Sequence, residues 1–283
     1  MAHFKPLKND SIQNLNTSTL INNSTDQIIS RKLSSKAKLD HSHRLPAIKT
    51  ETDATLRQLN IDDYIIMSLL AIISSVIRLY QLGSPRQVVF DEVYNIRDIN
   101  LILHRQFHFD IQPPFGKLLI AFVVSPFWHL SVNDCNLVTI GQTYSPDLPI
   151  FTARLLPAIF GSLLAVLSYY TMRDFAVRRP FAATSGFLIA TDPALILSSR
   201  VVQFDSLVSL SCVANCLFCY RLLMRSGADT FKNAVFFGIT TFLAVSSKYI
   251  GVYTVGGSLC LLLKNYISSR SMPKEDQVEV IFF

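Results

Sequence analysis

The sequence predicts an all-α polytopic membrane protein, a bundle of transmembrane helices with one polar loop on its luminal side. Half of the 283 residues are hydrophobic and only 16% are charged, and the mean hydropathy is +0.34, which is too apolar for an ordinary soluble domain. The apolar residues fall in runs that short polar gaps separate. Soon after the first run stand two adjacent carboxylates, Asp91 and Glu92. A half-dry membrane surface makes a carboxylate a stronger base, so this loop is the expected place for a general base.

The first 59 residues differ from the rest of the chain. They are polar, rich in Ser, Asn, Thr and Lys, and show no period that would bury one face of a helix or strand. A segment of this composition does not bury enough apolar surface to fold. We therefore expect residues 1–59 to be a disordered cytosolic tail and residues 60–283 to form the membrane domain.

Seven apolar runs follow the tail, and several are shorter than the roughly 20 residues that a bilayer requires. If all of them crossed the membrane, the basic gaps at residues 173–179 and 221–232 would face the lumen, against the positive-inside rule. If the short run at residues 118–130, which contains Pro126, instead lies in the interface or re-enters, both gaps face the cytosol. We prefer this second arrangement. The runs are residues 64–80, 118–130, 150–172, 181–199, 207–223, 235–247 and 252–263.

The second arrangement gathers charged residues at the luminal face. Cations hold a phosphate through charge-assisted hydrogen bonds, and a carboxylate beside them removes a proton from an incoming nucleophile. Such a set suits a transferase whose donor carries a phosphate on a lipid. Each cation taken alone is also explained by contact with lipid headgroups, so the inference rests on the whole set. Its members are Asp91, Glu92, Lys117, Arg154, Arg200, Asp205 and Lys248.

Two other interpretations of the polar residues are disfavoured. The net charge of +6 does not indicate a nucleic-acid partner, because the Lys and Arg residues lie in the tail and in the gaps between apolar runs. His104 and His108 lie four residues apart with Asp110 beyond, as zinc ligands do, but the sequence offers no convincing third and fourth ligands. An amphipathic helix on the luminal surface, with Ile99, Leu103 and Phe107 turned inward, is favoured instead. We expect no metal.

Four blocks of sequence carry a resemblance to a known family. The segment FDEVYNIRDINLILHRQFHFDIQPPFGKLLIA at residues 90–121 resembles the signature loop of the protein O-mannosyltransferases, the dolichyl-phosphate-mannose-dependent family with a GT-C membrane fold. Three later blocks follow in the family's order: RLLPAIFGSLLAV at residues 154–166, SSRVVQFDSLVSL at 198–210 and SSKYIGVYTVGG at 246–257. The resemblance implies the N-terminal transmembrane part of such a protein, a GT-C-like bundle with a luminal catalytic loop.

The resemblance also implies a role for each matching residue. Asp91 is expected to deprotonate a Ser or Thr hydroxyl of the acceptor protein, and Glu92 to assist acceptor or active-site geometry, with inversion at the anomeric carbon. Arg200 and Lys248 are expected to bind the donor phosphate. The donor, dolichyl-phosphate mannose, is a substrate, and no cofactor is expected. Supporting roles fall to Lys117, Arg154, Asp205 and Gln112, of which Arg154 serves packing or subunit pairing as easily as catalysis.

The chain departs from the family pattern at several points. Gln112 stands where many members have His, and an amide exchanges hydrogen bonds but does not titrate near neutral pH. Tyr94 and Tyr249 stand in place of a frequent His and a usual Trp. The family normally continues through further spans and a luminal β-trefoil module with MIR repeats. We find no such module in this sequence and expect the domain at residues 60–283 to be incomplete at its C-terminus.

These observations favour a multi-pass mannosyltransferase of the endoplasmic reticulum membrane, which modifies Ser and Thr hydroxyls of proteins and pairs with another copy or a related family member. A catalytically silent or truncated partner subunit is the alternative, and the intact Asp91 and Glu92 argue against silence. Another GT-C transferase that uses a polyprenyl-phosphate sugar is disfavoured by the ordered later blocks. A transporter is weaker still, because the charges collect at one face and not along a path through the bilayer midplane.

Overall fold

The computed structural model describes residues 58–132, 139–224 and 229–271. All of them belong to one compact unit, Ala54–Phe283. The predicted cytosolic tail lies almost entirely outside the described residues, so its disorder stays a prediction. Within the described residues the regular structure is helical, apart from one isolated bridge between Gln87 and Thr143. The predicted all-α class is confirmed.

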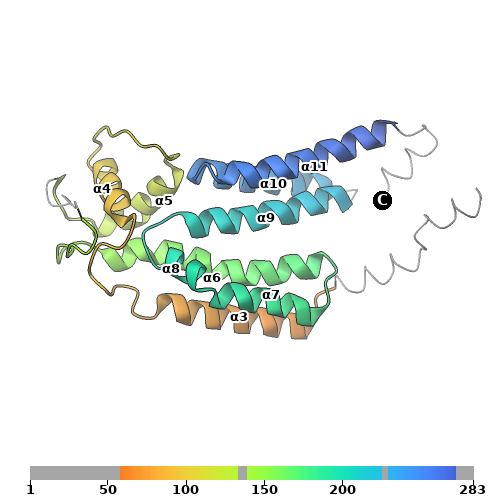
Figure 1. Cartoon of the computed structure of the whole chain (residues 1–283), viewed down its shortest axis with the longest axis horizontal. Helices are drawn as coiled ribbons and strands as arrows, with labels where there is room; N and C mark the ends of the chain where they lie inside the picture. The colour runs from red at the N-terminus through yellow and green to blue at the C-terminus, as the bar shows by residue number, and fades with distance from the viewer. Residues whose placement is uncertain (1–57, 133–138, 225–228, 272–283) are drawn as a thin grey trace, which may run out of the picture. The chain divides into compact units, whose positions relative to one another are not determined.

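Helices account for most of the described residues. They are α3 (Ile61–Leu79), α4 (Glu92–Leu103), α5 (Phe115–Val124), a short 3-10 turn (Ser125–Phe127), α6 (Ile150–Asp174), α7 (Arg179–Thr191), α8 (Pro193–Ser199), α9 (Asp205–Met224), α10 (Asp229–Ser247) and α11 (Gly251–Ser271). α6 packs against α3 and α7 on one side and against α9 on the other, and α10 and α11 extend the bundle beyond α9 (Figure 1). The short helices α4 and α5 pack together at one end of this bundle, where α5 also touches α6 and α10.

Small side chains allow α6 to lie among several neighbours. Ala158 and Ala165 are fully buried, and Gly161 faces both Ser199 of α8 and Arg78 of α3. In lipid, where apolar side chains gain little by leaving one apolar environment for another, helices associate through close packing at such small residues. The sequence of α6 therefore lets helices approach it from more than one side.

Two of the described helices, α6 with 25 residues and α9 with 20, are long and apolar enough to cross a bilayer. The predicted run at residues 181–199 is a broken helix, in which α7 and α8 meet at an angle of 55° and satisfy the same criterion as a pair. The predicted spans at residues 64–80, 235–247 and 252–263 are helical but fall short of that criterion. The run at residues 118–130 holds α5, which is too short to span alone. The number of spans stays a prediction.

Two arginines donate hydrogen bonds to backbone carbonyl groups near the ends of helices inside the bundle. The fully buried Arg78 of α3 donates through Nη1 to the carbonyl of Ala190 at 3.0 Å and through Nη2 to that of Ile189 at 3.1 Å, in the last turn of α7. Arg200, just after α8, donates through Nη1 to the carbonyls of Ile77 and Arg78 at 2.8 and 3.2 Å, near the end of α3. Carbonyls at a helix end lack an intrahelical partner, and leaving them unpaired away from water is costly. The two arginines therefore lock α3 to the break between α7 and α8.

A second group of charges joins α3, α6 and α7 at the other end of these helices. Its centre is the buried Asp63, which accepts hydrogen bonds from Tyr169, Arg173 and Arg179. Arg179 also pairs with Asp62 at 2.7 Å. Both arginines belong to the first basic gap, which the positive-inside rule places in the cytosol. Because each has an acidic partner, their charge serves helix packing, and the cytosolic placement stays a prediction.

Replacing Gly161 by Ala tests the close contact of α6 with α3 and α8. The new Cβ would lie 2.5 Å from the Cβ of Ser199 and 2.9 Å from Nε of Arg78, so these neighbours would have to move. We expect the free energy of unfolding to fall by about 1–3 kcal/mol, the usual cost of overpacking, as measured by thermal unfolding in detergent. In the control Gly256→Ala the new Cβ would meet nothing within 4 Å, and the unfolding temperature should stay unchanged or rise slightly. An unchanged transition in Gly161→Ala would contradict the described packing.

Candidate active site

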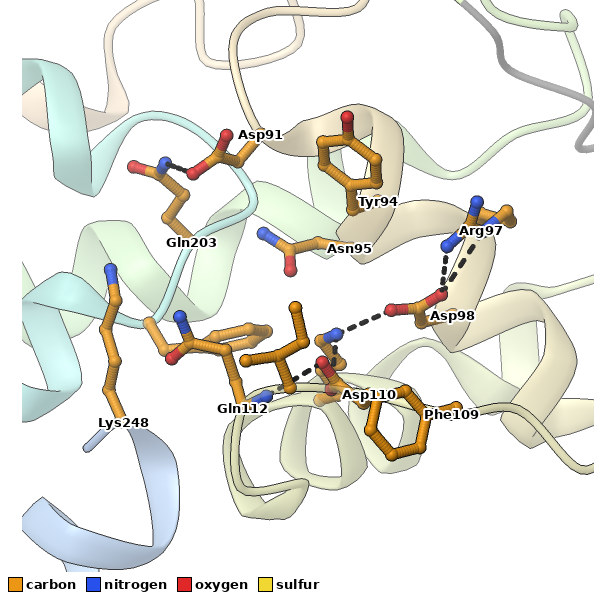
Figure 2. Close-up of a pocket in the computed structure, with 13 residues that line it drawn as sticks. Asp91, Tyr94, Asn95, Arg97, Asp98, Phe109, Asp110, Gln112, Gln203 and Lys248 are labelled. Atoms are coloured by element: carbon orange, nitrogen blue, oxygen red, sulfur yellow. Dashed lines mark hydrogen bonds and ion pairs between the residues drawn. The ribbon is translucent and has the colours of Figure 1, made fainter.

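A cavity of about 520 Å³ opens at the end of the bundle where α4 and α5 pack. Its walls come from α4, the segment between α4 and α5, α5 itself, the loop before α9 and the turn between α10 and α11 (Figure 2). Four of the predicted site residues line it: Asp91, Gln112, Lys117 and Lys248. Segments far apart in the sequence thus meet at one polar cavity, whose volume lies in the range of ordinary ligand sites.

Asp91 lines this cavity from the position just before α4. The residue is exposed, and Nε2 of Gln203 donates a hydrogen bond to its Oδ2 at 3.3 Å (Figure 2). The preceding residue, Phe90, has a φ of +52°, a left-handed conformation that bulky side chains rarely adopt and that clusters at functional sites. An oriented carboxylate that remains exposed to a cavity can accept a proton from a bound hydroxyl.

Glu92, the next residue, has the opposite environment. Its side chain is fully buried and accepts the guanidinium of Arg154 at 2.8 Å from Nε to Oε1 and at 2.7 Å from Nη2 to Oε2. The hydroxyl of Tyr144 donates to it at 2.8 Å, and the backbone N–H groups of Val202 and Val89 donate at 2.9 and 3.1 Å. Both oxygens are occupied by donors of the protein. Through these contacts Glu92 holds the walls of the site together.

Arg154 also fixes the loop that leads into α4. Its guanidinium donates to the backbone carbonyls of Leu82, Pro85 and Gln87 at distances between 3.0 and 3.3 Å. Burial and the neighbouring glutamate raise the pKa of the Tyr144 hydroxyl above its usual value, so this hydroxyl stays protonated and donates. The geometry gives Arg154 a packing role, which is one of the two roles that the sequence left open.

Lys117 of α5 is buried between two carboxylates. Its Nζ lies 2.6 Å from Oδ2 of Asp98 on α4 and 2.5 Å from Oδ2 of Asp110. Burial alone raises the pKa of Asp110, but the hydrogen bond and charge of Lys117 and the N–H of Gln112 outweigh it and lower that pKa below its usual value. The half-exposed Arg97 pairs with the other oxygen of Asp98 at 3.2 Å. This network ties α4, the following segment and α5 into one wall of the cavity.

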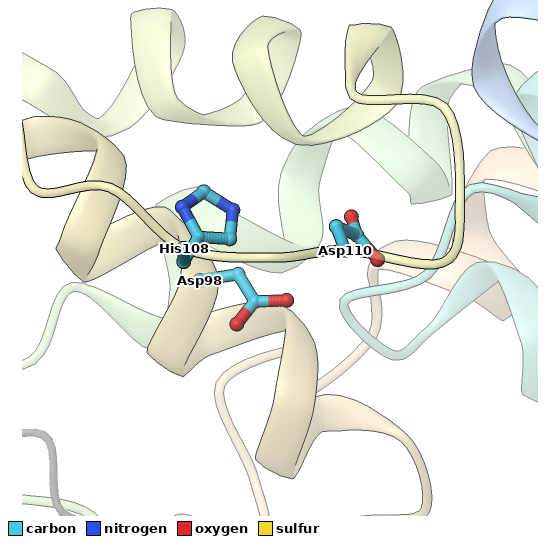
Figure 3. Close-up of side chains that lie close together, drawn as sticks. All are labelled: Asp98, His108 and Asp110. Carbon is cyan, nitrogen blue, oxygen red and sulfur yellow. The ribbon is translucent and has the colours of Figure 1, made fainter.

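The network of Lys117, Asp98 and Asp110 includes two carboxylates that could also serve as metal ligands. Asp98, His108 and Asp110 bring their ligand atoms within 4.8 Å of one another (Figure 3), a spacing that a metal ion can use. The ammonium of Lys117 contacts both carboxylates, however, so a divalent ion would have to displace this buried charge. His104 lies elsewhere, with Nδ1 2.9 Å from the carbonyl oxygen four residues before it. The geometry favours an ion-pair network, and the expected absence of a metal stays a prediction.

The expectation of an amphipathic helix that continues through Phe107 is wrong. α4 ends at Leu103. Arg105 has a φ of +56°, a left-handed conformation that a right-handed helix does not allow. Phe107, which was expected to face inward, is 95% exposed.

The two predicted phosphate ligands lie in different places. Lys248, in the turn between α10 and α11, lines the cavity and pairs at 2.6 Å with Asp205, the first residue of α9. Both side chains are partly exposed, and Figure 2 shows Lys248 on the same side of the cavity as Gln112. Arg200 is not among the lining residues, and its guanidinium is engaged by the carbonyls near the end of α3. The structure thus brings Lys248, and not Arg200, to the cavity of Asp91.

Sequence reasoning missed several residues of the cavity wall. Asn95 and Asp98 follow Asp91 at the i+4 and i+7 positions that share one helix face, and this spacing was a usable signal. Asn95 also ties α4 to the loop before α9, because its Nδ2 donates to the carbonyl of Val202 at 2.7 Å. Gln203 gave no signal, since a neutral amide in an irregular loop follows no period.

Replacing Arg154 by Ala would leave Glu92 buried without its cation. We expect the free energy of unfolding to fall by about 3–5 kcal/mol, because an unpaired charge would remain in the interior, and thermal unfolding in detergent would measure the loss. Adding Glu92→Gln to this variant should recover part of the lost free energy of unfolding. In the control Arg97→Ala the lost guanidinium is half exposed, so the change should cost at most about 1 kcal/mol. Equal losses in the two single variants would contradict the assigned roles.

The ion pair of Asp110 predicts a pH dependence of stability. Because the pKa of this carboxyl is lowered in the folded chain, its contribution is fully present above the unfolded pKa of about 3.9 and is lost as the pH falls through the lower folded value. The difference in unfolding temperature between the wild type and Asp110→Asn should shrink as the pH falls from about 5 to about 3. Thermal unfolding across this range measures it, and a difference that grew on acidification would refute the pairing.

Comparisons with known proteins place this chain in a family. The family model for dolichyl-phosphate-mannose-protein mannosyltransferase matches residues 68–283. Protein O-mannosyltransferase 1 of Drosophila melanogaster is 33% identical over 192 residues, which cover 66% of this chain and 21% of that protein. Dolichyl-phosphate-mannose–protein mannosyltransferase 1 of Saccharomyces cerevisiae is 28% identical over 224 residues, which cover 76% of this chain and 27% of that protein.

A solved structure is similar as well. It is that of the S. cerevisiae protein O-mannosyltransferase Pmt1-Pmt2 complex bound to the sugar donor, with a TM-score of 0.71 and 26% identity over 81% of this chain and 32% of that chain. The chain thus spans about a quarter of the length of the curated relatives named above. The structural match confirms the predicted GT-C-like membrane fold. Because the family model covers most of the sequence, the chain belongs to the dolichyl-phosphate-mannose-protein mannosyltransferase family.

Proposed function

We propose that this chain carries the catalytic part of a protein O-mannosyltransferase, which transfers mannose from dolichyl-phosphate mannose to Ser and Thr hydroxyls of proteins. One observation carries the proposal: the exposed Asp91 lines a cavity of about 520 Å³ at one end of an apolar helix bundle. The names of the relatives supply the donor and the protein acceptor. A cavity of this size admits a sugar together with a hydroxyl-bearing side chain.

In the proposed reaction Asp91 is the general base. Its carboxylate accepts the proton of the acceptor hydroxyl while the hydroxyl oxygen forms a bond to the anomeric carbon of mannose. The bond from that carbon to the phosphate oxygen breaks, and dolichyl phosphate leaves with the electron pair. A single displacement of this kind inverts the configuration at the anomeric carbon. Gln203, which donates to one oxygen of the base, orients it.

Lys248 is the proposed partner of the donor phosphate. Its partly exposed ammonium lines the same cavity as Asp91, and a cation there stabilises the charge that develops on the leaving phosphate. Asp205 holds the ammonium in position. Arg200 has an indirect, positioning role. Its contacts with the end of α3 fix the start of the loop that carries Gln203. A direct phosphate contact of Arg200 is not part of this proposal.

The setting and the partners of the chain belong to the same proposal. The apolar helices α6 and α9 indicate a membrane protein. We assign it to the endoplasmic reticulum membrane, with several spans, the cavity on the luminal side and residues 1–59 in the cytosol. The similar solved structure is a Pmt1-Pmt2 complex, so we assign this chain a partner that is another copy or a longer family member.

Replacing Asp91 by Asn keeps the size of the side chain and removes the base. We expect mannose transfer to fall by roughly 100- to 10,000-fold, the usual contribution of a general base, while the unfolding temperature stays unchanged. The assay follows labelled mannose from dolichyl-phosphate mannose to a Ser/Thr-rich peptide in membranes that carry this chain, with and without a full-length family member. Asp147→Asn removes an exposed carboxylate of the loop before α6 and serves as the control. Transfer that requires the partner and ignores Asp91 would make the chain a silent subunit.

A further inference from the structure

Residues 107–111, which we call the edge segment, lie outside any helix, and the two sides of this segment differ in chemistry. Figure 3 shows the chain running straight from His108 to Asp110. Phe107, Phe109 and Ile111 are 95%, 83% and 76% exposed, while His108 and Asp110 between them are partly buried. An alternation with a period of two is the geometry of a β-strand. One side of the edge segment is therefore a row of large apolar side chains open to solvent.

The backbone of the edge segment is open as well. Among the described parts of the chain, no backbone hydrogen bond joins residues 107–111 to another segment. The nearest such bonds are donated by Gln106 to Leu101, before the segment, and by Leu118 to Pro114, after it. An extended chain with free N–H and C=O groups is a template on which a second extended chain can pair.

The inner side of the edge segment is fixed before any partner binds. Asp110 contacts the buried Lys117, which also holds Asp98 of α4. Oδ1 of Asp110 accepts the N–H of Gln112 at 3.0 Å. These contacts hold the segment against α4 and α5. A preorganised edge loses little conformational entropy when a partner is added.

The edge segment borders the cavity of Asp91. Phe109 and Ile111 both line this cavity, and Figure 2 shows Phe109 across it from Asp91. A polypeptide paired along the segment would pass the cavity. Because successive side chains of an extended chain point to opposite sides, one of them can enter the cavity while its neighbours rest on the apolar row.

We propose that the edge segment docks the acceptor polypeptide, which pairs with residues 107–111 as an added strand and extends a Ser or Thr side chain toward Asp91. Apolar side chains of the acceptor cover Phe107 and Phe109. The docking rests on the proposed function. Immersion of the same row in the bilayer is disfavoured, because hydrocarbon cannot satisfy free backbone groups, whereas a peptide backbone satisfies them.

Substitutions that remove the rings test the apolar row. In Phe107→Ser the KM for a Ser-containing acceptor peptide should rise roughly tenfold, the usual effect of losing an aromatic contact at an interface. The KM for dolichyl-phosphate mannose, the kcat at saturating peptide and the unfolding temperature should stay unchanged. Phe122→Ser removes a ring of α5 that is 77% exposed and should leave both KM values unchanged. A higher KM for the donor with an unchanged KM for the peptide, as expected of rings that insert among lipids, would overturn the docking.

Peptides methylated at single backbone nitrogens test the strand pairing. Methylation at alternate positions, whose N–H groups face the edge segment, should weaken binding roughly tenfold, and methylation at the positions between them should not. Binding is read from the fluorescence anisotropy of a labelled peptide on membranes that carry this chain without the donor, so it does not depend on transfer. Alternating binding without any mannose transfer would support the docking and overturn the proposed function. Transfer that ignores both the methyl groups and the rings would overturn the docking and support the proposed function.

Discussion

The contact between Glu92 and Arg154 is the interaction on which the rest of this structure depends. Removing two charges from water costs roughly several kcal/mol for each ion, and their attraction offsets this cost only with good geometry and further hydrogen bonds. Here the carboxylate of Glu92 accepts hydrogen bonds from two guanidinium nitrogens, from the hydroxyl of Tyr144 and from two backbone N–H groups. The pair joins α4, α6 and the loops beside them. The cavity wall therefore cannot shift without leaving a buried charge unpaired.

The two adjacent acids have different roles because their side chains point in different directions. Successive residues at the start of a helix point about 100° apart, so the burial of Glu92 leaves its neighbour Asp91 exposed. The acid that is saturated with donors fixes the backbone, while the acid that Gln203 orients from one side faces the cavity. A base held in this way needs little reorganisation when a hydroxyl arrives, which is the main advantage of a preorganised site.

The helical class could be predicted because apolar runs are a local pattern. The arrangement of those runs also predicted that Asp91, Lys117 and Lys248 gather at one face, and all three line the cavity. The end of α4 could not be predicted, since a left-handed Arg105 turns the chain there and no proline or glycine marks it. The partner of Arg200 could not be predicted either. Its acceptors are carbonyls that become free only where α3 ends beside the break between α7 and α8. Backbone acceptors of this kind leave no trace in the side-chain pattern.

The contacts of the cations determine how much positive charge the cavity offers to a ligand. Of the four cations expected around it, Lys117 is held by carboxylates, Arg154 by a glutamate and Arg200 by carbonyls, which leaves Lys248 with a partly exposed ammonium that Asp205 partly offsets. Acidic and basic side chains line the cavity in equal number. In the proposed reaction the donor is a phosphodiester, and the lipid phosphate that leaves carries more negative charge. A denser group of cations would bind this product more tightly than the donor and slow its release, so a nearly neutral cavity suits a site that must turn over.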